Sequence, residues 1–157
     1  MPQPSPFYFQ DVERCVDEII ARVGQRIVLG IPLGIGKPNP LVNALYRRVK
    51  MNPNLYLKIL TAITVEIPKG SSDLEQRFLE PFVERVFGNY PDLEYALDLR
   101  AGRVPPNIEI VEFFFKPGGF MNMPIPQQNY ISTNYTHVIR DALDNGVNVW
   151  AQQVATR

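Results

Sequence analysis

The chain has 157 residues, in which 16 lysines and arginines balance 16 aspartates and glutamates, so its net charge is zero. This length suits one domain with a substantial core, and we expect residues 1–157 to form a single domain. The absence of a basic excess argues against nucleic acid or an anionic membrane as a partner. Because Cys15 is the only cysteine, no disulfide can form within one chain, which indicates a reducing compartment.

The N-terminal six residues include three prolines and are predicted to be flexible. They lack the basic and apolar regions of a secretory signal peptide. No window of the chain approaches the ~18 apolar residues needed to span a bilayer. We therefore expect a cytoplasmic protein without a membrane partner.

Predicted helices and strands alternate along the chain. Apolar residues at helical spacing predict helices over residues 11–23, from Pro40 to Lys50, and over 72–87, 93–99 and 136–143. Short apolar runs predict strands over residues 26–29, 55–65, 108–115 and 147–154. The third helix begins with a capping-box pattern, Ser72 and Glu75, and Pro81 should kink or split it.

This alternation predicts an α/β fold, an open and mostly parallel sheet with helices on both faces. The final strand lies close to residue 157, and no helix follows to cover it. Because both faces of a parallel sheet are normally covered, we expect this domain to be incomplete.

The loop between the first strand and the second helix is the first candidate site. Asn39 is predicted to cap that helix and Pro40 to occupy its first position. The unpaired N–H groups of a helix start can hold an anion, and Lys37 would add a positive charge. Gly34, Gly36, Lys37 and Asn39 are therefore candidate substrate-binding residues. The alternative is that Gly34 and Gly36 only permit a tight turn.

Standard nucleotide-binding motifs do not fit this loop. A Walker A motif needs four residues before its Gly-Lys pair, whereas five separate Gly30 from Gly36, and Pro38 replaces the serine or threonine. The dinucleotide fingerprint fails as well, because no third glycine follows Gly34 and Gly36.

A polar stretch at residues 127–137 is the second candidate site. Its amides and hydroxyls could orient a polar ligand without a fixed charge. The candidate residues are Asn129, Ser132, Asn134 and His137. The alternative is a loop in which Thr133 or Asn134 caps the following helix. His137 is the only histidine, so we expect no metal site.

Catalytic groups are less clearly marked. Ser132 or Cys15 could pair with His137, but neither has a nucleophile elbow. Glu109 and Glu112 lie within the third predicted strand, and Glu66 ends the second, where open α/β sheets usually bind ligands. We rank Glu66 first of the three, although a solvated or capping role is the simpler explanation for each. Phe113, Phe114 and Phe115 are expected to pack in the core and at its edge rather than to form a stacking platform for bases, because no basic groove accompanies them.

Five consecutive blocks resemble the N-terminal part of the acetyl-CoA hydrolase/transferase family of class I CoA-transferases. They are IVLGIPLGIGKPNPLVNALYRR, LKILTAITVEIP, RFLEPFVERVFGNYP, VPPNIEIVEFFFKPGG and QQNYISTNYTHVIRDALDNGVNVWAQQVA. The resemblance covers nearly the whole chain from about Arg26 onward. It implies an enzyme of two related open α/β domains, with the active site between them.

In that family, a glutamate attacks the acyl-CoA thioester to give an acyl-glutamyl anhydride and free CoA, which then returns to form a glutamyl-CoA thioester. The resemblance places that glutamate in a second domain, so we assign no catalytic residue here. It also implies that both candidate loops face the interdomain cleft. The implied partners are acyl-CoA, a small carboxylic acid or water, and the second domain. Coenzyme A is a substrate, no cofactor is expected, and we expect a homo-oligomer. The alternative function is a non-catalytic α/β module that binds a small anion or a partner subunit.

Overall fold

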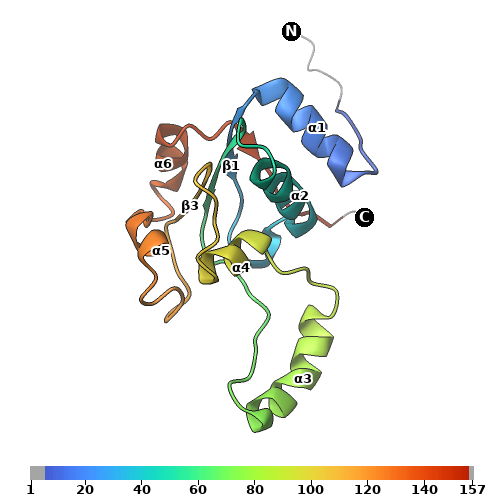
Figure 1. The fold of residues 1–157 in the computed structure, drawn as a ribbon, viewed down its shortest axis with the longest axis vertical. Coiled ribbons are helices and arrows are strands. Elements are labelled where there is room, and N and C mark those ends of the chain that lie inside the picture. Colours follow the sequence, from blue (N-terminus) through green and yellow to red (C-terminus); the bar gives the residue numbers. More distant parts are fainter. Residues whose placement is uncertain (1–5, 156–157) are drawn as a thin grey trace.

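The computed structural model describes residues 6–155 as an α/β fold (Figure 1). Its strands are β1 (Arg26–Gly30), β2 (Tyr56–Thr61), β3 (Ile108–Glu112) and β4 (Val149–Trp150). Its helices are α1 (Val12–Val23), α2 (Asn39–Lys50), α3 (Asp73–Phe87), α4 (Glu94–Arg100), α5 (Pro124–Gln128) and α6 (Val138–Asp144), with a 3-10 turn at Gly34–Gly36. The flexibility predicted for residues 1–6 falls mainly on residues 1–5, which lie outside the described residues.

The four strands form one sheet in the order β3-β2-β1-β4, and all neighbours are parallel. In register, Leu29 lies beside Ile59, which in turn lies beside Ile110. The parallel sheet predicted from the sequence is therefore confirmed. Because the strands run the same way, the carboxyl ends of β1, β2 and β3 meet at one edge, where ligands bind in open α/β sheets.

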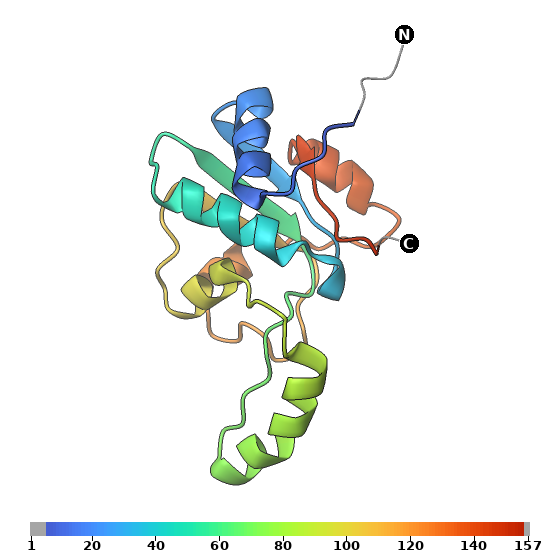
Figure 2. The same cartoon turned by 90° about the vertical axis from the view of Figure 1, so that its right-hand side faces the viewer.

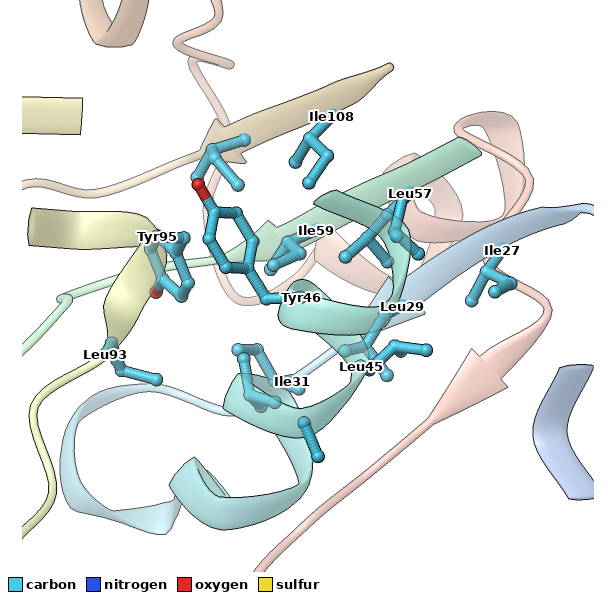
Figure 3. Close-up of a cluster of buried hydrophobic side chains, with 14 of the residues drawn as sticks. Ile27, Leu29, Ile31, Leu45, Tyr46, Leu57, Ile59, Leu93, Tyr95 and Ile108 are labelled. Carbon is cyan, nitrogen blue, oxygen red and sulfur yellow. The ribbon is translucent and has the colours of Figure 1, made fainter. Parts of the chain in front are cut away.

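Helices cover both faces of the sheet, as predicted, but unequally. One face packs against α1, α2 and α4 in a large core, in which Leu45 and Tyr46 of α2 lie near Leu57 and Ile59 of β2 (Figure 3). The other face carries a small cluster of Leu60, Val111 and Ala142, the last of which is supplied by α6. Beside that cluster, α6 and Trp150 line an apolar groove of about 290 Å³. The second face is thus thinly covered within residues 6–155.

Three strands are shorter than predicted. After β2 the chain turns at Ile63, where φ is +47°, and the Ile63 N–H donates to Phe114 O at 2.8 Å. Because of this turn, β2 ends at Thr61 rather than at residue 65, and β3 ends at Glu112 rather than at residue 115. β4 has only two residues because it pairs with Leu29 and Gly30 alone. The short helix α5 was not predicted.

The prediction that Asn39 caps α2 is wrong. Pro38 is the N-cap residue, and the side chain of Asn39 instead donates a hydrogen bond to Pro91 O at 2.7 Å. Asn43, one turn later, donates to Asp92 O at 2.8 Å and accepts from the Glu94 N–H at 3.0 Å. The two buried amides therefore fasten the segment at the start of α4 to α2, while the Oδ1 of Asn39 has no hydrogen-bond partner among the described residues.

Helix α3 projects from the rest of the fold as an arm (Figure 2). Ser72 caps it by accepting from the Glu75 N–H at 3.3 Å, as predicted, although Glu75 reaches back to the Ser71 N–H at 2.7 Å rather than to Ser72. The helix continues through Pro81, so the predicted split does not occur. No residue of α3 is buried.

Candidate functional site

A buried polar cluster lies at the carboxyl edge of the sheet, where β1, β2 and β3 end. Lys37 follows β1, Thr64 follows β2, and Glu112 is the last residue of β3. Only 1%, 5% and 3% of these residues are exposed, respectively. Three polar residues with little access to water, supplied by three neighbouring strand ends, make this edge the strongest candidate site in the described structure.

The Glu112 carboxyl group is only half satisfied. Its Oε1 accepts a hydrogen bond from the Thr64 hydroxyl, whose oxygen also lies 2.8 Å from the phenol oxygen of Tyr95. Its buried Oε2 has no hydrogen-bond partner among the described residues. A buried polar atom without a partner costs free energy, so this oxygen is positioned to bind a group that is not part of the chain.

Lys37 lies at the same edge but does not neutralise Glu112 directly. Its ammonium group donates to Ala62 O at 2.7 Å and to Ile63 O at 3.1 Å, just beyond β2. Burial lowers the pKa of Lys37 to about 8, and the attraction of Glu112 offsets this only in part. Lys37 therefore anchors the loop after β1 to the end of β2.

Burial has the opposite effect on the acid. It raises the pKa of the Glu112 carboxyl group above its usual range, and the Thr64 hydrogen bond and Lys37 oppose this shift. A raised pKa favours the neutral carboxylic acid, which can donate a hydrogen bond as well as accept one. The raised pKa therefore makes the neutral, donating form of Glu112 more accessible than that of an exposed glutamate.

Glu112 lines a cavity of about 170 Å³ at this edge. The rest of its wall comes from the ends of other elements: Thr64, Glu66, Arg100, Phe120 and the turn Lys116, Pro117, Gly118 and Gly119. That turn is tight, because the Gly119 N–H donates to Lys116 O at 2.7 Å and Gly118 has a φ of +75°. The charged residues of the wall are thus two carboxyl groups, Glu66 and Glu112, and two cations, Arg100 and Lys116.

Two of the charged residues that line this cavity, Arg100 and Glu66, bind each other. Arg100 forms a two-pronged ion pair with Glu66, with its Nη2 2.5 Å from Glu66 Oε2. The guanidinium also lies over the ring of Phe120, 5.0 Å from its centre. Lys116 is exposed and has no ion pair within residues 6–155. Lys116 is therefore the cation left to meet a ligand.

The four predicted residues of the first loop, Gly34, Gly36, Lys37 and Asn39, make different contacts in the structure. Lys37 and Asn39 are buried and bound to backbone carbonyls, as described above. Gly34 has a φ of +58°, and its N–H donates to Ile63 O at 3.2 Å. A Cβ on Gly36 would lie 3.3 Å from Pro32 Cγ. In the described structure, none of the four lines the cavity, although Lys37 lies behind it at the same strand ends.

The second loop begins at the same edge but leads away from it. The Ile131 N–H donates to Glu112 O at 3.1 Å, and Asn129 ends α5. Ser132, Asn134 and His137 are exposed, and none of them, nor Asn129, contributes to the cavity wall drawn from residues 6–155.

Asn134 has a local structural role in this loop. Its side chain accepts from the N–H groups of Thr136 at 3.0 Å and His137 at 3.2 Å, just before α6. This is the turn-forming role given above as the alternative to ligand binding.

Sequence reasoning ranked Glu66 above Glu112, and the structure reverses their order. Glu66 lies beyond the end of β2, paired with Arg100, whereas Glu112 lies buried in the cavity. The available signal was a lone carboxylate within an otherwise apolar run, residues 110–115. Thr64, Arg100 and Lys116 gave no comparable signal, because only the folded chain brings them to Glu112.

These features define the chain as an open α/β protein with a half-satisfied acid at its sheet edge. Comparison with protein-family models, curated proteins and solved structures found no match. Within residues 6–155, no three acidic, histidine or cysteine side chains come together as a metal site. No helix in the same range is long and apolar enough to cross a membrane.

Proposed function

We propose that this chain forms one wall of the acyl site in a CoA-transferase or acyl-CoA hydrolase whose nucleophilic glutamate lies outside the chain. The sequence resemblance described above motivates the reaction class. The observation that carries the proposal is the buried Glu112, with an unpartnered oxygen, in a small cavity at the carboxyl edge of a parallel sheet.

The size of the cavity supports a short acyl group. Pockets that enclose drug-sized ligands have volumes of roughly 300–1,000 Å³, whereas this cavity has about 170 Å³. It accommodates an acetyl group or a short carboxylate, with the bulk of CoA outside. The exposed Lys116 beside the turn then offers a positive charge to a substrate carboxylate or to CoA.

The chemistry of Glu112 also supports this role. When a carboxylate attacks a thioester, negative charge develops on the carbonyl oxygen, and a hydrogen-bond donor fixed beside that oxygen lowers the barrier. A protonated Glu112 is such a donor. Burial disfavours the carboxylate form of Glu112, which supports a donor role for this residue and leaves the attack to the glutamate outside the chain that the resemblance implies.

The test uses the chain together with any natural continuation after Arg157. This protein is incubated with acetyl-CoA, with and without succinate, while free thiol and new thioester are measured separately. Thiol release without succinate supports a hydrolase, and a succinyl thioester supports a transferase. Neither product, or full activity from residues 1–157 alone, contradicts the proposal.

One observation favours a second candidate, a non-catalytic module that binds a small anion. Lys116 has no ion pair in the described part of the chain and lines the cavity with its positive charge. If acetyl-CoA is not turned over but acetate or phosphate shifts the NMR signals of residues 116–119, this second function is supported.

A further inference from the structure

Two buried hydroxyl groups form a chain of hydrogen bonds that ends at Glu112. Tyr95 of α4 and Thr64, just after β2, are 0% and 5% exposed, and Tyr95 lies in the large core (Figure 3). The phenol oxygen of Tyr95 lies 2.8 Å from the Thr64 oxygen, and the Thr64 hydroxyl is hydrogen-bonded to Oε1 of Glu112. Each hydroxyl carries a single proton, so the direction of one bond sets the direction of the next.

The direction of this chain follows from Tyr95. Thr64 supplies the only hydrogen-bond partner of the Tyr95 hydroxyl among the described residues. If Tyr95 accepted from Thr64, its own proton would be buried without an acceptor, which costs free energy. When Tyr95 donates instead, the Thr64 proton is directed to Oε1 of Glu112, and each hydroxyl proton has an acceptor. Burial raises the pKa of Tyr95 well above its ordinary value, so the phenol keeps the proton that it donates.

We propose that Tyr95 and Thr64 are positioning residues, which hold the proton of the neutral Glu112 carboxyl group on Oε2. Oε1 is engaged as an acceptor, so the proton lies on the oxygen that has no partner among the described residues. Glu112 then offers an O–H donor, which suits an oxygen with a free lone pair, as in a carboxylate or a thioester carbonyl. The inference rests on the proton-holding role of Glu112 in the proposed function, but not on the identity of the nucleophile.

Charged groups near Glu112 do not supply this orientation. Lys37 attracts the ionised carboxyl group and Glu66 repels it, so their effects on its pKa oppose each other. Neither residue hydrogen-bonds to this group in the described structure, because Lys37 donates to backbone carbonyls and Glu66 binds Arg100. Thr64 is therefore the residue that makes the two carboxyl oxygens different.

Carbon-13 NMR titration of the Glu112 carboxyl carbon in the whole chain tests the proposal. Thr64→Val keeps the shape of the side chain but removes the donor, so the Glu112 anion loses its hydrogen bond and its proton affinity should rise roughly tenfold. Tyr95→Phe should raise the pKa by less, because Thr64 still donates but is no longer polarised by Tyr95. Thr64→Ser keeps the hydroxyl and should restore the wild-type titration.

The matched control is Tyr46→Phe. Tyr46 is as fully buried as Tyr95 in the same core, but its hydroxyl donates to Asp98 at 2.8 Å (Figure 3). Its loss should lower the free energy of unfolding without moving the Glu112 titration. A raised wild-type pKa that neither Thr64→Val nor Tyr95→Phe moves, or an equal change in the control, overturns the chain and leaves the proposed function standing. An ordinary glutamate titration in the wild type would instead contradict the proposed function itself.

Glu112→Gln tests which oxygen carries the proton. Its amide copies the neutral acid and, with its carbonyl held by Thr64, should place the NH2 group where Oε2 stands. Acetate should then move the proton signals of this NH2 group downfield. Adding Thr64→Val lets the amide turn over, so acetate affinity should fall roughly fivefold, whereas adding Tyr46→Phe should leave it intact. NH2 signals that acetate leaves unchanged, or equal acetate affinity with and without Thr64→Val, would contradict the proposed orientation.

Discussion

Lys37 and Glu112 are buried on neighbouring segments at one edge of the sheet, yet Lys37 donates its hydrogen bonds to backbone carbonyls rather than to Glu112. Each residue still feels the charge of the other. Burial of both groups shifts their pKa values toward the neutral forms. The stability of the fold should therefore depend on pH in two separate ranges.

The first range belongs to Glu112. Because burial raises its pKa in the folded state, the folded chain holds the proton more tightly than the unfolded chain. The free energy of unfolding should fall as pH rises above the ordinary glutamate pKa of 4.5, by at most about 1.4 kcal/mol per pH unit. Glu112→Gln, which cannot ionise, should remove this fall. Urea unfolding of both proteins between pH 4 and pH 8 measures it, with Glu109→Gln on the same strand as the control.

The second range belongs to Lys37, whose pKa falls from 10.5 to about 8 on folding. The unfolded chain then binds the proton more tightly, so stability should rise with pH between those two values, by about 3 kcal/mol in total. In Lys37→Met this rise should be absent. Urea unfolding between pH 7.5 and pH 10.5 would show it, and an identical profile for both proteins would contradict the buried position of Lys37.

Gly30 lies directly under the ring of Trp150. A Cβ at Gly30 would approach Trp150 Cε3 to 2.3 Å, so Gly30→Ala must displace the ring and weaken the pairing of β1 with β4. We expect a loss of roughly 1–3 kcal/mol, typical of overpacking. Trp150 is the only tryptophan, so a change in its fluorescence reports the displacement of the ring. The control is Ala101→Gly, a change of the same two residue types outside the sheet. Gly102→Ala would not serve, because the φ of Gly102 is +64° and alanine would be strained there.

Lys116 should determine how strongly a small carboxylate binds the cavity. Lys116→Ala should weaken acetate binding by roughly tenfold, because, of the two cations that line the cavity, Arg100 is paired with Glu66 and Lys116 has no ion pair among the described residues. Arg140→Ala, a similar change of charge on exposed α6, should leave binding intact. NMR titration with acetate compares the variants, and equal weakening would show a general effect of net charge.

The fold was largely predictable because short apolar runs indicate buried strands and apolar residues at helical spacing indicate amphipathic helices. The sequence was a poorer guide to the residue at which each strand ends and to the partner that each polar side chain binds. Lys37 resembles a free cation in a glycine loop, but its partners are carbonyls of residues 62 and 63, supplied by the next strand connection. Asn39 resembles a cap, and only the loop at Pro91 draws its side chain elsewhere. Such roles depend on contacts between distant segments, which spacing along the chain does not encode.

The proposed function requires that Glu112 hold a proton in a cavity that receives a small carboxylate. Carbon-13 NMR of the Glu112 side-chain carboxyl carbon, followed from pH 3 to pH 9 with and without acetate, tests this requirement most directly. We expect a pKa above the usual range for glutamate and a further change in that signal when acetate binds. An ordinary glutamate titration that acetate leaves unchanged would contradict the proposed role of Glu112.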